Sequence, residues 1–270
     1  MAILIAGATG FIGSHLVGAG AARGHEVIAL SRSGRHVRGA AKSFQWSFGH
    51  PIPAAACDGV ACAINLAHDF SGVDGAGRTL EGTIAMARQL RASGVKRQIF
   101  FSSYSAGQHA NSIYGKTKFA VENELASIEG MIIVRPGLVI GEGGIYGRIR
   151  KFAHKYPIIP LPDGGKGKIP VIGIEYLCGQ TMKLVNEPTP PKEVNLFERD
   201  LKSLRQLVLE SAGELGRRPV IVAVPSRIVM VALTLAEWLS LPLPVNKDSL
   251  IGFTSNREAR HVPTAGYLKP

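Results

Sequence analysis

The sequence predicts an α/β protein with a doubly wound parallel sheet and a small C-terminal cap. Uncharged apolar runs alternate with segments of helical spacing from residue 2 to residue 140, which is the pattern of strands joined by crossover helices. The runs are continuously apolar, as expected for strands buried on both faces of a parallel sheet. The first run ends in a glycine-rich turn, which this fold class uses after its first strand.

The first strand is expected at Ala2–Ala6, followed by the turn Gly7-Ala8-Thr9-Gly10-Phe11-Ile12-Gly13 and a helix from Ser14 to Arg23. This arrangement binds a dinucleotide pyrophosphate, because glycines let backbone N–H groups approach the phosphates and the helix N-terminus adds partial positive charge. The alternative is an ordinary glycine-rich turn, since 32 of the 270 residues are glycine.

The second strand is expected at Val27–Leu30 and runs into Ser31, Arg32 and Arg35. In a dinucleotide-binding fold this strand end meets the adenosine ribose. An acidic residue there accepts hydrogen bonds from a free 2′-hydroxyl, whereas an arginine pairs with a 2′-phosphate. The sequence therefore favours NADP(H) over NAD(H). A solvated arginine at a strand end is the alternative.

The rest of the chain predicts further elements in the same alternating order. Strands are expected at 43–46, 60–67, 98–101, 131–134 and 220–224, and helices at 78–93, 112–127, 175–185 and 201–215. Three stretches look like loops: 68–77, which is polar and glycine-rich, and 156–162 and 163–168, which are rich in proline and in glycine. We expect residues 1–145 to form a dinucleotide-binding Rossmann core, and 146–270 to supply the remaining core elements and a small substrate-binding cap.

Tyr114 and Lys118 are four residues apart in the predicted helix 112–127, so they share one helix face. An ammonium group lowers the pKa of a nearby phenol and can also hold a ribose hydroxyl. The tyrosine can then exchange a proton with a carbonyl or alcohol while hydride moves to or from nicotinamide. A Tyr-x-x-x-Lys match alone also arises by chance.

Composition and charge limit the other classes of function. Three cysteines (Cys57, Cys62, Cys178) make neither a disulfide framework nor a metal spacing, and none of the eight histidines has metal spacing, so we expect a reducing, cytoplasmic location and no metal. The first apolar run has no basic region before it, so we expect a core strand and no signal peptide. The net charge is +11, but the basic residues are scattered, which favours anionic ligands over nucleic acid.

Taken together, the segments GATGFIG (7–13), INLA (64–67), FFSS (100–103), YGKTK (114–118) and RPGLVIG (135–141) resemble the extended and atypical short-chain dehydrogenase/reductase superfamily of epimerase/dehydratase-like proteins. The resemblance covers residues 1–145 well and the remainder loosely. It implies Tyr114 as the acid/base, Lys118 as its partner and Ser103 as the assisting serine, ahead of Ser102 and Ser105. The implied cofactor contacts are Gly7, Thr9, Gly10, Phe11, Ile12, Ser31, Arg32, Arg35, Leu66, Ala67, Lys118 and Pro136.

Some residues depart from the superfamily pattern. Thr79 stands where extended relatives often have an asparagine, and His68 stands where a glycine usually follows the INLA-type strand. We expect His68 and His109 to be solvated loop histidines near the active face, with substrate contact as the alternative. The chain is also short for a nucleotide-sugar enzyme.

The stretch Ile228–Leu239 is apolar but too short for a membrane span. It is expected to be a mostly buried cap helix or a dimer contact. The alternatives are an apolar wall for a lipid-like substrate and a surface that contacts a membrane or protein partner.

Two functions follow. The first is an NADP(H)-dependent oxidoreductase, epimerase or dehydratase that acts on a small or apolar carbonyl or alcohol through Ser103, Tyr114 and Lys118. The second is a non-catalytic NADPH-binding accessory or sensor protein, since the resemblance extends to an accessory subunit of respiratory complex I that holds NADPH.

Overall fold

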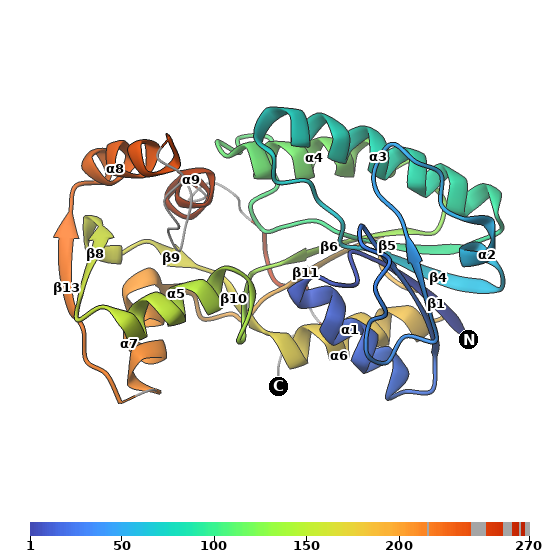
Figure 1. Ribbon diagram of the computed structural model, residues 1–270, viewed down its shortest axis with the longest axis horizontal. Helices are drawn as coiled ribbons and strands as arrows, with labels where there is room; N and C mark the ends of the chain where they lie inside the picture. The colour runs from blue at the N-terminus through green and yellow to red at the C-terminus, as the bar shows by residue number, and fades with distance from the viewer. Residues whose placement is uncertain (215, 239–246, 256–260, 265, 268–270) are drawn as a thin grey trace.

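A computed structural model describes residues 1–214, 216–238, 247–255, 261–264, 266 and 267. Its centre is a seven-stranded sheet in which all neighbouring strands run parallel (Figure 1). The strand order, β11-β6-β5-β4-β1-β2-β3, confirms the doubly wound Rossmann topology. The strands are β1 (Ala2–Ala6), β2 (Glu26–Ser31), β3 (Lys42–Gln45), β4 (Val60–Asn65), β5 (Arg97–Phe101), β6 (Met131–Pro136) and β11 (Glu193–Leu196).

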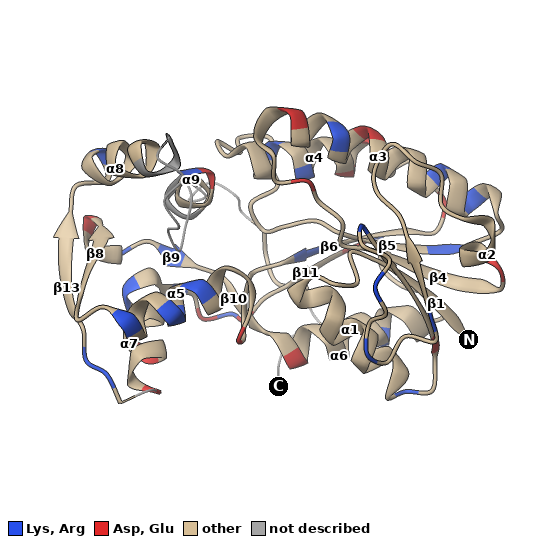
Figure 2. Cartoon of the chain, viewed as in Figure 1, with Lys and Arg blue, Asp and Glu red and all other residues tan. Residues whose placement is uncertain are grey.

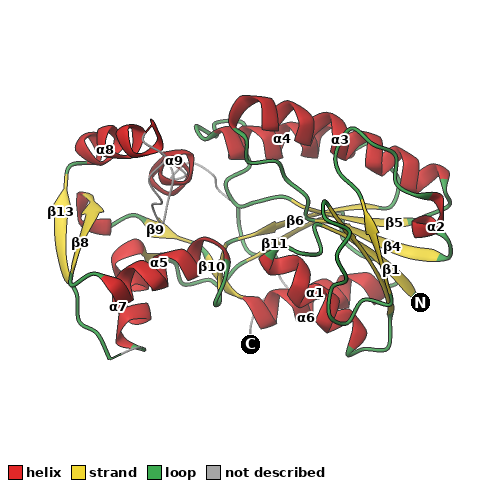
Figure 3. Cartoon of the chain, viewed as in Figure 1, coloured by secondary structure: helices red, strands yellow, loops and turns green. Residues whose placement is uncertain are grey.

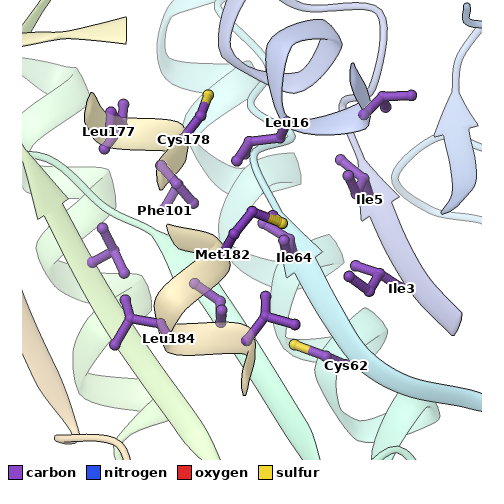
Figure 4. Close-up of a cluster of buried hydrophobic side chains, with 14 of the residues drawn as sticks. Ile3, Ile5, Leu16, Cys62, Ile64, Phe101, Leu177, Cys178, Met182 and Leu184 are labelled. Atoms are coloured by element: carbon purple, nitrogen blue, oxygen red, sulfur yellow. The ribbon is translucent and has the colours of Figure 1, made fainter. Parts of the chain in front are cut away.

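Helices cover both faces of this sheet (Figure 3). Helices α1 (Phe11–Ala21) and α6 (Ile174–Asn186) lie on one face, and α3 (Gly72–Ala92) and α4 (Ile113–Leu125) lie on the other; the short α2 (Ala54–Cys57) precedes β4. Side chains of β1 alternate between the two faces. Ile3 and Ile5 pack with Leu16 and Met182 on one face (Figure 4), whereas Leu4 and Ala6 pack in the hydrophobic core on the other face. This double burial explains the continuous apolar runs.

Apart from α6 and β11, the chain after β6 builds a smaller layer beside the sheet. Its helices are α5 (Gly144–Lys155), α7 (Leu204–Gly213), α8 (Ser226–Trp238) and α9 (Lys247–Ser255), with the short turn η1 (Asp163–Gly165). Its strands form three two-stranded pairs: β7 (Leu138–Ile140) with β10 (Val171–Gly173), β9 (Lys168–Ile169) with β12 (Lys202–Ser203), and β8 (Ile158–Pro162) with β13 (Val220–Val224). Helices α5 and α7 pack together over Ile159 and Leu161 of β8.

Two predicted loops are wrong. Helix α3 begins at Gly72, within the glycine-rich stretch, because its first turn packs closely against Asp69: a Cβ on Gly75 would lie 2.6 Å from the Asp69 carbonyl oxygen. The proline-rich residues 158–162 form strand β8, which pairs with one strand, β13, in the described part of the chain. Such an edge tolerates prolines because the missing N–H groups are not needed in a second ladder. The predicted helix 201–215 begins later, at Leu204, and Leu215 lies outside the described residues.

The apolar stretch 228–239 forms most of α8, but it is not mostly buried within the chain. Leu233 is 5% exposed, whereas Ile228, Val231 and Leu235 are each more than half exposed. Leu239 lies outside the described residues. Among the described residues, no helix is both long and apolar enough to cross a membrane.

We expect Leu233→Asp to destabilise the protein by several kcal/mol, because it buries an unpaired carboxylate. Leu235→Asp is the matched control on the same helix, where the side chain is 54% exposed, and should leave the free energy of unfolding nearly unchanged. Denaturant unfolding of both variants tests this. Equal losses of stability would contradict the placement of Leu233.

Candidate active site

The glycine turn after β1 leaves space that a side chain would fill. Gly7 has a φ of +80°, and a Cβ there would lie 3.1 Å from the backbone of Leu66 and Ala67. A Cβ on Gly13 would lie 2.2 Å from the Gly7 carbonyl oxygen, so only glycine lets α1 approach the turn this closely. Gly10 is the N-cap of α1 and provides no side-chain cap. The turn and the helix N-terminus therefore fit a pyrophosphate.

The other expected cofactor residues follow the carboxyl ends of neighbouring strands. The amides of Gly7 and Ala8 donate to the carbonyl of Leu30, which brings the end of β2 to the glycine turn. Beyond it Ser31 is buried, and Arg32 and Arg35 are exposed. Thr9 is exposed, whereas Phe11 and Ile12 are partly buried and pack against the core.

Two further expected contacts flank this edge. Leu66 donates its amide to the Ala6 carbonyl at 3.0 Å and so lies beside the glycine turn with Ala67. Pro136 ends β6, and its carbonyl accepts from the Tyr104 amide at 3.0 Å, beside the segment that carries Ser103.

The structure brings Ser103, Tyr114 and Lys118 together. Tyr114 is partly buried, and the Ser103 side chain lies close enough to act on the pKa of its phenol. Lys118 is 2% exposed, and its Nζ donates to the Phe101 carbonyl at 2.7 Å. Its Nζ also lies 4.6 Å from the Phe100 ring centroid and 5.7 Å from that of Tyr114. The spacing along α4 therefore places both side chains on one face, as predicted.

Burial sets the protonation of this group. It raises the pKa of Tyr114 to about 12, and the hydrogen bond with Ser103 opposes that shift. Burial lowers the pKa of Lys118 to about 7, and the Glu122 carboxylate acts in the opposite direction. The phenol of Tyr114 is therefore protonated at neutral pH, whereas the amine of Lys118 titrates close to neutral pH.

A buried ion pair fixes the inner side of α4. The guanidinium of Arg135 donates to both carboxylate oxygens of Glu122, at 2.9 and 2.6 Å, and to Glu193 at 2.7 Å. Ser102 also donates to Glu122. Ser102 is thus turned toward the interior, whereas the neighbouring Ser103 hydroxyl shares a 2.8 Å hydrogen bond with Ser105.

His68 is not the solvated loop residue that we expected. Its ring lies edge-on to Tyr114 with centroids 4.8 Å apart, and edge-on to Phe70 at 4.5 Å. Burial lowers the pKa of His68 to about 3, and the Lys118 ammonium adds to this shift. A neutral imidazole therefore borders Tyr114, and its buried Nδ1 has no hydrogen-bond partner among the residues that the structure describes. His109 is exposed, as expected.

A carboxylate far along the chain from α4 also reaches this helix, and no sequence pattern indicated it. Asp248 of α9 accepts from the backbone amides of Ile113 at 2.6 Å and Tyr114 at 3.0 Å. Ser112 accepts from Gly115 at 3.0 Å. Together the two residues cap the helix that carries Tyr114 and Lys118, and the Asp248 charge also complements the helix dipole.

The sequence is similar to those of known proteins. Residues 3–164 match the family described as the NAD dependent epimerase/dehydratase family. The ceramide reductase of Caulobacter vibrioides is 26% identical over 276 residues, which cover 96% of this chain and 84% of that protein.

Solved structures share the fold. MoeE5 in complex with UDP-glucuronic acid and NAD superposes with a TM-score of 0.71 at 19% identity, covering 84% of this chain and 86% of that one. The UDP-glucose 4-epimerase of Thermotoga maritima gives a TM-score of 0.67 at 18% identity, covering 83% and 86%.

We expect Asp248→Ala to lower the free energy of unfolding by about 1 kcal/mol through loss of the cap. It should also reduce the order of the Tyr114 end of α4, visible as faster amide hydrogen exchange at Ile113 and Tyr114. Asp74→Ala is the control, because Asp74 lies in the first turn of α3. Unchanged exchange at both amides in Asp248→Ala would contradict the capping role.

Proposed function

Because the chain belongs to the NAD dependent epimerase/dehydratase family, we propose that it is an NADP(H)-dependent oxidoreductase acting on a carbonyl or alcohol of an apolar, lipid-like substrate. Family membership makes it an enzyme of the NAD(P)-dependent epimerase, dehydratase and reductase class. The observation that carries the finer proposal is the placement of Tyr114 between Ser103 and Lys118 at the carboxyl edge of the sheet.

The residues present fit a dinucleotide. The space kept open by Gly7 and Gly13 and the uncapped start of α1 suit the pyrophosphate. Arg32, exposed at the end of β2, is suited to pair with a 2′-phosphate, with Arg35 close by. When bound, the nicotinamide supplies hydride to, or accepts it from, the substrate carbon.

Tyr114 would serve as the proton donor in the reductive direction. A phenol with a pKa near 12 stays protonated at neutral pH and can donate to the developing alkoxide oxygen. Ser103 would donate a second hydrogen bond to the same oxygen. Lys118 carries partial charge at neutral pH, since its pKa lies near 7, and would stabilise the phenolate that remains.

The aromatic surroundings of Tyr114 support an apolar substrate. Phe70 is 75% exposed, and its ring lies parallel to Tyr114 at 6.0 Å. His68 is uncharged beside it. The ceramide reductase of Caulobacter vibrioides, similar along 96% of this chain, is named for a lipid substrate. Together these observations favour a carbonyl on a lipid-like molecule over a nucleotide sugar.

One observation favours the second candidate, a non-catalytic NADPH-binding protein. The rings of His68 and Phe70 both lie against Tyr114, so the phenol is covered by the chain's own side chains. A protein of this kind would bind NADPH and show no dependence on the Tyr114 hydroxyl.

We expect Tyr114→Phe to retain NADPH affinity while turnover falls by about two orders of magnitude or more, since only the exchangeable proton is lost. Lys118→Ala should weaken both. The measurement is nicotinamide oxidation with a panel of long-chain ketones and, separately, UDP-sugars. Tyr104→Phe is the control, because Tyr104 contacts Phe197 and His261. Normal turnover by Tyr114→Phe would overturn the assignment, and no turnover by wild type would favour the non-catalytic candidate.

We expect the protein to bind NADPH more tightly than NADH, and Arg32→Asp to reverse the order, because it replaces a phosphate-pairing cation with a repelling anion. The loss of NADPH affinity should be about tenfold or more. Calorimetric titration of both cofactors measures this, with Arg88→Asp on α3 as the exposed-arginine control. Equal affinity of the wild-type protein for the two cofactors would refute the proposed preference.

A further inference from the structure

Helix α8 turns large apolar side chains toward solvent. Ile228, Val231 and Leu235 are 59%, 60% and 54% exposed. Their spacing of three and four residues places them on one side of the helix. Leu233, on the opposite side, is the buried contact. The outward side of α8 is thus more apolar than a surface helix needs for solubility.

The strands that precede α8 add a second apolar surface. Val220 and Val222 of β13 are paired with Ile158 and Pro160 of β8 in a parallel register, so all four side chains share one face. Val220 is 62% and Ile158 is 58% exposed. Figure 1 places β8, β13 and α8 at the end of the molecule farthest from β1 and β2. We call Ile158, Val220, Val222, Ile228, Val231 and Leu235 the apolar end.

Positive charge is concentrated in the same part of the chain. Residues 144–169 and 198–235 together contain twelve Lys and Arg but five Asp and Glu, so they hold +7 of the formal net charge of +11. Arg217 and Arg218 lie just before β13, and Arg227 lies in the first turn of α8. Blue segments in Figure 2 mark α5, α7 and the chain leading into β13.

We propose that the apolar end docks on the surface of an anionic lipid bilayer. Apolar side chains inserted at the headgroup boundary, combined with basic residues beside them, bind such a surface without spanning it. Among the described residues, no helix is long and apolar enough to cross a membrane. A second copy of the chain fits less well, because a two-fold contact would bring two basic surfaces together.

The docking is independent of the proposed chemistry and rests only on the apolar end and its charge. If the substrate is lipid-like, docking also brings the enzyme to the bilayer in which the substrate is dissolved. The two proposals can fail separately, because vesicle binding is measured without turnover.

The test is flotation of the full chain with vesicles of phosphatidylcholine alone and with added phosphatidylglycerol. Wild type should float with the anionic vesicles at low salt and dissociate as salt screens the charges. The double variant Val231→Asp, Leu235→Asp should lose at least tenfold in binding. Val73→Asp is the matched control, because Val73 on α3 is 74% exposed and lies outside the apolar end. Circular dichroism and thermal unfolding of each variant check that it is folded.

The proposal is overturned if wild type does not bind anionic vesicles, or if the double variant binds as well as wild type does. It is also overturned if vesicles are not bound and the double substitution turns a dimer into a monomer in sedimentation. In that case the apolar end is an interface between copies of this chain.

Discussion

Burial of the central sheet on both faces is the constraint on which the rest of the structure depends. Helices on each side shield the inner strands β1, β5 and β6 from water, so most of their residues are apolar, and the expected site residues lie near the carboxyl edge of the sheet. Ser31 and Pro136 end their strands, and the glycine turn and Ser103 follow strand ends. The location of the candidate site is therefore a consequence of how the core is packed.

Because the core is apolar, burying the charged side chains of α4 in it is unfavourable in free energy. This helix carries Lys118 and Glu122 into the interior, where an unpaired charge is strongly unfavourable. Glu122 is compensated by Arg135, which in turn reaches Glu193 at the sheet edge. Lys118 has a carbonyl and an aromatic ring as partners, and its pKa falls instead. The amine of Lys118, next to Tyr114 on α4, thus has a pKa of about 7.

Local patterns were enough to predict the alternation of strands and helices up to β6, the glycine turn and the shared face of Tyr114 and Lys118, but not the edge strand β11. The start of α3 was missed because its glycines serve close packing on Asp69, which resembles a loop in sequence. The burial of His68 depends on its contact with Tyr114 of α4, which is far away in the sequence. Hydropathy could not distinguish the buried Leu233 from the exposed Leu235, because both are leucines of one apolar stretch. The substrate side of the site depends on such contacts between distant segments.

Asp248 carries a consequence for how the protein is made. The carboxylate that caps α4 is 134 residues later in the chain than the Tyr114 amide it accepts from. During synthesis the sheet strands β1 to β6 and the helix α4 leave the ribosome well before this carboxylate does. Until residue 248 has been translated, α4 has only its Ser112 cap, and the amides of Ile113 and Tyr114 lack the Asp248 carboxylate.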